Sequence, residues 1–161
     1  MSHKRRETYI RASLLDRLVD LTPKFPQAEI RPLRAQTPKA LYASLRRDLE
    51  WLFNTRCPVP EAELKQRQRS VIDYGVMDFG TFFTHNQEDF RRLAQHIEQT
   101  IGIYEPRLQE SHVTVTLLCG SHRELQVRLD ARLIIDDINQ PVSFPIIIDT
   151  KKGGRVKVLG S

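Results

Sequence analysis

The period of the apolar residues changes across residues 101–108, Ile-Gly-Ile-Tyr-Glu-Pro-Arg-Leu, and this change most restricts the possible folds. Before it, apolar residues recur at helical spacing, and after it they alternate at strand spacing. Pro106 has a fixed φ and no N–H, and it disfavours the α region for Glu105. A helix arriving from upstream is therefore expected to end near Tyr104. If the chain is extended at this corner, Glu105 and Arg107 share one face, because a strand repeats every two residues.

Length and composition predict a single domain that comprises the whole chain. A chain of 161 residues can bury a substantial core, and 40% hydrophobic with 28% charged residues is typical of soluble globular proteins. No apolar run approaches the roughly 20 residues that span a bilayer, and the basic arm 1–11 lacks the apolar segment of a secretory signal. Cys57 and Cys119 match no metal or disulfide pattern, so reduced thiols in a cytosolic protein are expected. Within the domain, we expect a helical part over 37–104 and a sheet part over 108–158.

Three helices with a polar N-cap and an apolar stripe are predicted upstream of the corner, and the charged residues 61–69 are expected to form either a short solvated helix or a loop. The first is a short amphipathic helix over 13–18, with Ser13 as its N-cap, and a linker or surface loop over 22–36 follows it. The second begins at Thr37-Pro38, and Asn86 caps the third. The apolar positions expected from the spacing are Leu14, Leu15, Leu18 and Leu21 in the first helix, Leu41, Leu45, Leu49 and Leu52 in the second, and Phe90, Leu93, Ala94, Ile97 and Ile101 in the third.

The segment between the second and third helices is expected to be packed but irregular from residue 70 onwards. Gly75 and Gly80 tolerate positive φ, and the segment is too apolar to lie free in solvent. The aromatic residues that support this expectation are Tyr74, Phe79, Phe82 and Phe83.

Downstream of the corner, alternating apolar residues predict four short strands. The second strand, over 125–135, is the longest uninterrupted alternation in the chain, and Pro145 is expected to break the third strand or to mark an edge or bulge. The predicted fold is α+β, with N-terminal helices packed on a C-terminal antiparallel meander of about four strands. An open edge of this sheet near the C-terminus can accept a strand from another chain. The inward positions are Val113, Val115 and Leu117, then Leu125, Val127, Leu129, Ala131, Leu133 and Ile135, then Val142, Phe144, Ile146 and Ile148, and the turns are Cys119–His122, Asp136–Asn139 and Lys151–Gly154.

Catalytic and metal-binding patterns are missing from the sequence. The serine-hydrolase elbow and the His-Glu-x-x-His motif are absent, and the glycines of Lys151-Lys-Gly-Gly154 follow the lysines, unlike those of a phosphate loop. Glu105 is the one carboxylate in an unusual setting, but Arg107 would favour its ionised form, which makes it a poor general acid. We expect no cofactor, no metal and no small-molecule substrate. The histidines, which form no cluster at ligand spacing, are His3, His85, His96, His112 and His122.

A formal charge of +5 permits an anionic partner. The basic residues are not organised by any nucleic-acid-binding motif, and aromatic residues do not interleave with them. A solvated basic surface is therefore the preferred interpretation, and a nucleic-acid-binding module is kept as an alternative. The residues concerned are Lys4, Arg5, Arg6, the patch 65–69, Lys151, Lys152, Arg155 and Lys157.

Four segments, taken in order and spacing, resemble the TssE family of type VI secretion baseplate subunits, which is similar to the sheath-initiating wedge protein of contractile phage tails. They are Ser13-Leu-Leu-Asp-Arg-Leu18, Arg47-Asp-Leu-Glu-Trp-Leu-Phe-Asn-Thr-Arg56, Ser70-Val-Ile-Asp-Tyr-Gly75 and Tyr104-Glu-Pro-Arg-Leu108. The resemblance covers nearly the whole chain, from about residue 10 to residue 158. It implies a structural, non-enzymatic protein of the cytoplasm that lies in the baseplate wedge beside TssF and TssG.

The resemblance also implies that the first ring of the TssB/TssC sheath grows from this subunit, by addition of sheath strands to its sheet. The Glu105, Pro106 and Arg107 motif is implied to bind the wedge. The other interpretation of this motif is an internal salt bridge that only fixes the fold, and an exposed pair of this kind contributes only about 0–1 kcal/mol. The family has also carried the label "lysozyme-like", so a peptidoglycan hydrolase is the alternative enzymatic function, although the residues do not support it.

Overall fold

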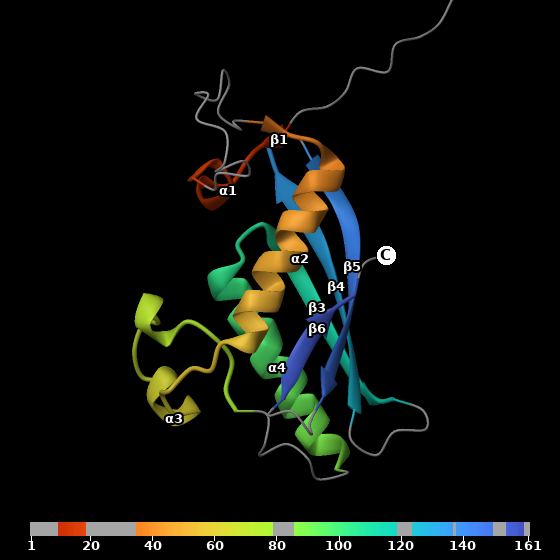
Figure 1. Cartoon of the computed structure of the whole chain (residues 1–161). Coiled ribbons are helices and arrows are strands. Elements are labelled where there is room, and N and C mark those ends of the chain that lie inside the picture. Colours follow the sequence, from red (N-terminus) through yellow and green to blue (C-terminus); the bar gives the residue numbers. More distant parts are fainter. Residues whose placement is uncertain are drawn as a thin grey trace, which may run out of the picture. The chain divides into compact units, whose positions relative to one another are not determined.

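The computed structural model describes residues 10–18, 35–78, 86–118, 124–136, 138–149 and 154–159. The chain divides into two compact units, residues 1–45 and 46–161, and the boundary falls within one helix. Each unit is described by itself below, and the single domain stays a prediction. The elements in chain order are β1 (Ile10–Arg11), α1 (Leu14–Leu18), β2 (Ala35–Gln36), α2 (Pro38–Asn54), α3 (Glu61–Leu64), the 3-10 turn η1 (Val71–Asp73), α4 (Gln87–Tyr104), β3 (Leu108–Leu117), β4 (Glu124–Ile135), β5 (Ile138–Asp149) and β6 (Arg155–Val158) (Figure 1).

The first unit contains a short antiparallel strand pair that the sequence analysis missed. β1 pairs with β2, and Ile10 is buried. The prediction of a basic arm through Arg11 and of a loop through Gln36 is therefore wrong at residues 10–11 and 35–36. A two-residue strand is too short to show a period, which is why the pattern did not reveal it. Residues 1–9 and 22–34 lie outside the described part of the chain.

The caps of α1 and α2 form as predicted. The Asp16 N–H donates to Ser13 Oγ at 3.2 Å, and the Ala40 N–H donates to Thr37 Oγ1 at 3.3 Å. These oxygens satisfy N–H groups that have no partner within a first helical turn. The predicted leucine stripe of α1 is exposed at Leu14, Leu15 and Leu18, and Leu21 lies outside the described residues.

The second unit takes its core from the end of α2, from α4 and from the sheet. In α2, Leu49 and Leu52 are buried and the helix ends at Asn54, as predicted, and Leu41 and Leu45 of the first unit are buried too. In α4, the Glu88 N–H donates to the Asn86 side chain at 3.1 Å, and the helix ends at Tyr104. The predicted stripe of α4 is buried at Leu93, Ile97 and Ile101 and half-buried at Phe90 and Ala94.

The sheet is an antiparallel meander of four strands in the order β3-β4-β5-β6, which confirms the α+β prediction. α4 packs along β3 (Figure 1). One face of the sheet is apolar because buried residues of β4 lie opposite buried residues of β5 and these lie opposite those of β6. The opposed buried pairs are Leu125 with Ile148, Val127 with Ile146, Leu129 with Phe144, Ala131 with Val142, Ile148 with Val156 and Ile146 with Val158.

A bulge in β3 explains why this strand begins earlier than its alternation predicts. The register with β4 shifts between Gln109 and His112, and Glu110 has a φ of 50°. One extra residue reverses the inward and outward positions. Leu108 and Val113 are therefore both buried, although they lie five positions apart. Farther along, Val115 is half-buried and Leu117 is exposed, so the alternation predicted from these residues fades along the strand.

Pro145 does not break the third predicted strand, because β5 is paired with β4 without a shift of register. The alternative, an edge, holds only in part: β5 lies between β4 and β6, and Pro145 comes just before the residues of β5 that pair with β6. The Pro145 carbonyl accepts from the Leu159 N–H at 2.8 Å, just beyond the end of β6. In a strand, the N–H and the carbonyl of one residue face the same side. The N–H that Pro145 lacks would therefore face the side of β5 where β6 has already ended.

Gly75 occupies the positive-φ conformation expected of it. Its φ is 120°, and a Cβ at this position would lie 2.5 Å from the Thr55 carbonyl oxygen. The close approach lets Val76 form a parallel bridge with Arg56. Of the other predicted features, Phe79, Gly80, Phe82, Phe83, the Cys119–His122 turn and residues 151–153 lie outside the described residues.

Candidate functional site

The backbone at the helix-to-sheet corner forms a turn. The Glu105 N–H caps α4 by donating to the Ile101 carbonyl at 2.8 Å, and the Leu108 N–H donates to the Glu105 carbonyl at 3.0 Å. The expectation of an extended corner is therefore wrong. Pro106 occupies the second position of this turn, where its fixed φ is favourable. The Ile134 N–H donates to the Arg107 carbonyl at 2.9 Å and ties the turn to β4.

The turn brings the two predicted charges into a bidentate ion pair. Arg107 Nε lies 2.5 Å from Glu105 Oε1, and Arg107 Nη2 lies 2.5 Å from Glu105 Oε2. A second carboxylate, from Asp48 of α2, accepts from Arg107 Nη2 at 2.8 Å. The guanidinium is thus held by two carboxylates, and one of them, that of Asp48, is 59 residues away from Arg107 in the sequence. Asp48 left no signal in the sequence, because its contact with Arg107 depends on how the chain folds back.

This ion pair is buried, so the exposed-pair estimate of its strength does not apply. Glu105 is 5% exposed, and the side chain of Arg107 is 18% exposed. Removing one partner of such a pair leaves an uncompensated charge inside the protein, which typically costs about 3–5 kcal/mol. The internal salt bridge of the sequence analysis is therefore present, and it is important for the fold.

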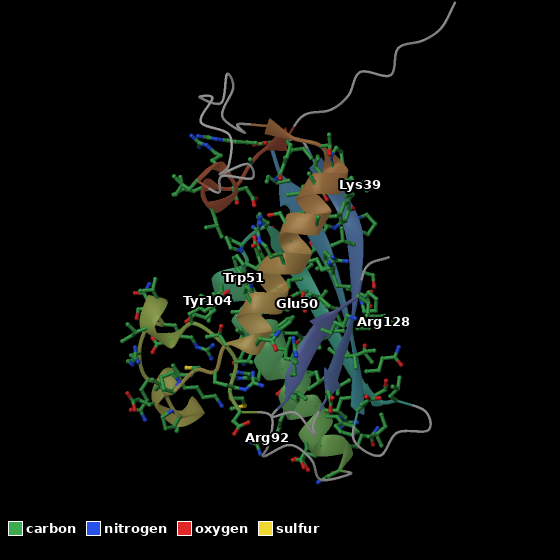
Figure 2. The ribbon with its side chains drawn as sticks, in the orientation of Figure 1. Lys39, Glu50, Trp51, Arg92, Tyr104 and Arg128 are labelled. Carbon is green, nitrogen blue, oxygen red and sulfur yellow. The ribbon has the colours of Figure 1, made fainter. Side chains whose placement is uncertain are left out.

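Electrostatics keep Arg107 charged. Burial on its own would lower the pKa of Arg107, but the Glu105 and Asp48 carboxylates outweigh burial and raise the pKa well above its ordinary value. Asp48 also accepts from Arg47 Nη2 at 2.8 Å, and the Arg47 guanidinium lies 5.0 Å from the Trp51 ring centroid. Trp51 is half-exposed on α2 (Figure 2). The cluster therefore reaches from the buried corner to the surface.

A second charge cluster supports the corner from the η1 segment. Asp73 is buried, and its oxygens lie 2.8 and 2.6 Å from Arg67 Nη1 and Nη2. Hydrogen bonds from Arg67 and from the Ser70 N–H lower the pKa of Asp73. The Tyr104 hydroxyl, at the end of α4 (Figure 2), donates to the Ser70 carbonyl at 3.0 Å. This cluster was also missed, because charged residues in a polar stretch give no pairing signal.

Tyr74 connects the two clusters. Its ring packs edge to face on Tyr104 with centroids 5.2 Å apart. Burial raises the pKa of Tyr74, and so do the nearby Asp48 and Glu105 carboxylates. Three of the four segments that carry the family resemblance, those from residue 47 onwards, therefore meet around this corner.

The geometry gives no support to acid catalysis by Glu105. Both of its carboxylate oxygens accept from the Arg107 guanidinium, so neither oxygen is free to meet a substrate. Asp48 is bound to the same guanidinium. A general acid must lie within hydrogen-bond reach of the group that it protonates.

The remaining candidate residues do not converge. Among the described residues, no group of three or more histidine, cysteine, aspartate or glutamate side chains is arranged to hold a metal ion. His96 is buried, with Nε2 accepting from the Met77 N–H at 3.1 Å, whereas His112 is exposed. Cys57 is a free thiol. Arg155 and Lys157 are exposed on β6, and the residues outside the described ranges are His3, Lys4, Arg5, Arg6, His85, Cys119, His122, Lys151 and Lys152.

Fold and site together define a small α+β protein in which a buried ion cluster joins a helix to an antiparallel sheet. Residues 39–137 match the family described as baseplate wedge protein gp25, and the chain belongs to this family. The matched region contains the whole corner. No helix in the described ranges is both long and apolar enough to cross a membrane.

A solved structure shows a similar fold. A chain of the structure titled "The baseplate complex from the type VI secretion system" superposes with a TM-score of 0.50 at 13% sequence identity, covering 76% of this chain and 97% of that chain. At this identity the likeness concerns the fold. No curated protein sequence matches the chain.

Proposed function

We propose that this chain is a TssE-type structural subunit of a type VI secretion baseplate. In this proposal it is a cytoplasmic, non-catalytic protein that binds TssF and TssG in the wedge and starts the TssB/TssC sheath by strand addition. Membership of the baseplate wedge family supports the role, and so does the fold shared with a chain of a type VI baseplate complex.

The corner is the observation that carries the proposal for wedge binding. Glu105, Pro106 and Arg107 form one rigid turn, and Pro106 is exposed at its tip. Arg107 Nη1 is buried and has no hydrogen-bond partner among the described residues. A buried donor without a partner is costly. In this proposal, docking against Pro106 displaces the atoms that enclose Nη1 in the free chain, so that a carbonyl or carboxylate oxygen of a wedge subunit satisfies the donor.

The salt bridge and the docking role are compatible, because they use different atoms of Arg107. Nε and Nη2 bind Glu105 and Asp48 within the chain, which leaves Nη1 to a partner. The test must therefore remove Nη1 and keep the charge. Arg107→Lys does so, because an ammonium reaches Glu105 without the planar fork of a guanidinium.

The experiment is co-purification of the Arg107→Lys variant with TssF and TssG of the same system, with a melting curve recorded in parallel. We expect a folded protein that no longer retains these subunits. The matched control is Arg132→Lys, because Arg132 is an exposed arginine that binds Glu110 at 3.2 Å on the outer face of the sheet. If the folded Arg107→Lys variant retains TssF and TssG as the unmodified chain does, the corner fixes the fold only.

A muramidase assay separates the structural role from the hydrolase alternative. We expect no turnover of peptidoglycan by the purified chain. Turnover that Glu105→Gln abolishes would instead assign Glu105 a catalytic role and would contradict the structural proposal.

A further inference from the structure

The η1 turn exposes two large apolar side chains, Val71 and Ile72, which together are called the apolar tip below. Val71 is 87% exposed and Ile72 is 73% exposed, and the turn, yellow-green in Figure 1, stands away from the sheet. Single exposed apolar residues are common on protein surfaces, whereas these two are adjacent. Both are β-branched, so they have little rotamer freedom to lose when another protein covers them.

The backbone of the apolar tip is held in place by Asp73. This carboxylate accepts from the Ser70 N–H at 2.9 Å and from both terminal nitrogens of Arg67. The Asp73 N–H in turn donates to the Ser70 carbonyl at 3.1 Å and closes the turn. The tip is therefore fixed before any partner arrives, which lowers the entropy cost of binding.

Tyr104 connects this turn to the helix-to-sheet corner. Tyr104 directly precedes Glu105, and its hydroxyl donates to the Ser70 carbonyl at 3.0 Å. Its ring also packs on the ring of Tyr74, just after the turn. One side chain thus spans the distance between the turn and the corner, so a protein that covers the corner can contact the apolar tip on the same side.

An arginine without a carboxylate partner lies beside the apolar tip. Arg69 is half-buried, and within the described ranges its one hydrogen bond is a long one, from Nη1 to Thr100 Oγ1 at 3.5 Å. Arg67, by contrast, is paired with Asp73 at 2.6 Å. A guanidinium forms its strongest hydrogen bonds with carboxylates, so Arg69 favours a partner that brings an acidic side chain to the tip.

The charge pattern favours a protein over a membrane as this partner. Segments that bind anionic lipids usually contain about four to eight basic residues. Next to the apolar tip, the charge of Arg67 is already neutralised by the buried Asp73. One unpaired arginine beside two rigid apolar side chains matches a single pocket with one carboxylate at its rim.

We propose that the apolar tip inserts into an apolar pocket of a wedge subunit, TssF or TssG, and that a carboxylate at the rim of this pocket binds Arg69. This inference rests on the proposed function, which places a wedge subunit over the corner. It adds an apolar contact to the polar contact proposed for Arg107 Nη1, and it gives the chemistry of the surface that receives it.

The test measures the affinity of purified TssF/TssG complex, from the same system, for variants of the full chain. Val71→Ser combined with Ile72→Ser removes the apolar tip and keeps the backbone of the turn. We expect binding to weaken at least about thirtyfold, because two apolar side chains are no longer buried. Leu117→Ser is the matched control, because Leu117 is 40% exposed at the far end of β3, about 30 Å along the strand from the corner. It should change binding by less than about twofold.

A second variant tests the carboxylate at the rim of the pocket. Arg69→Gln removes the charge and keeps a side chain that can reach Thr100. We expect binding to weaken about threefold to tenfold at low salt, and the difference from the unmodified chain should shrink at high salt, because salt screens the lost attraction. Arg128→Gln, at an exposed arginine of β4, should show neither effect.

Melting curves show whether the variants fold. Both residues of the apolar tip are exposed, so the double serine variant should melt within a few degrees of the unmodified chain. If it does not fold, Val71→Thr replaces it, because threonine keeps the β-branched shape and exchanges one methyl group for a hydroxyl. This smaller change should weaken binding about fivefold.

The outcomes separate the inference from the proposed function. If the unmodified chain binds TssF/TssG and the folded tip variants bind equally well, the inference is wrong and the proposed function survives. If the unmodified chain binds neither subunit, both are overturned. Vesicles of phosphatidylglycerol that bind the unmodified chain but not the tip variant, with TssF/TssG binding unchanged, would assign the tip to a membrane surface. Loss of self-association in the tip variant, with TssF/TssG binding unchanged, would assign it to a second copy of this chain, and either result overturns the inference.

Discussion

The helix-to-sheet corner and the free edge of β3 use the same chain segment in opposite ways. At the corner, Glu105 and Asp48 hold two of the Arg107 nitrogens inside the protein. A few residues farther along, Val115 and Leu117 present backbone groups that no described residue pairs. The corner is therefore nearly complete without a partner, whereas the edge is not.

This difference separates two kinds of interaction surface. A corner built on buried charges has a fixed geometry and suits permanent association, because moving it would uncouple a buried ion pair. A free edge suits a partner that arrives as an unstructured arm and becomes a strand on binding. Substitutions at the corner are expected to affect stability first, and substitutions at the edge to affect binding alone.

The largest effect is expected from Arg107→Ala. This change leaves Glu105, which is 5% exposed, without its partner, and we expect the free energy of unfolding to fall by about 3–5 kcal/mol. Arg128→Ala is the control, since Arg128 is an exposed arginine on β4 (Figure 2) that binds Asp130 at 2.9 Å. It should cost less than about 1 kcal/mol. Urea unfolding of both variants measures the difference, and equal losses would contradict the view of the corner as a buried cluster.

A smaller effect is expected from Asn54→Ala, which tests whether a side chain closes the β6 edge. The substitution removes the two hydrogen bonds to Val156, and we expect a loss of about 1–2 kcal/mol in the free energy of unfolding. Hydrogen exchange should become faster at the amide of Val156. An unchanged exchange rate would show that Asn54 does not protect this edge.

Sequence periodicity predicted the helices and the sheet well. The caps at Ser13, Thr37 and Asn86 and the end of α4 at Tyr104 depend on residues close together in the chain, and all four are confirmed. The long alternation of β4 is confirmed for the same reason. Local rules succeed where both partners of an interaction lie within a few residues of each other.

The misses have a common cause, which is contact between distant segments. The pairing of β1 with β2 joins residues 10–11 to 35–36, and Asp48 meets Arg107 from 59 positions away. The bulge at Glu110 also left no local signal, because glutamate rarely adopts a positive φ. The pairing of Glu105 with Arg107 was predictable, whereas its burial and its third member were not.

The smallest effect is expected at Glu98, where the closed and open parts of the β3 edge meet. Glu98→Ala removes the acceptor of the Val113 N–H, so exchange at that amide should become faster, with a loss of about 1 kcal/mol in the free energy of unfolding. Glu98→Gln keeps a side-chain oxygen that can accept the same hydrogen bond, and it should retain most of the protection. Unchanged exchange at the Val113 amide in Glu98→Ala would contradict the role of Glu98 as the acceptor that protects it.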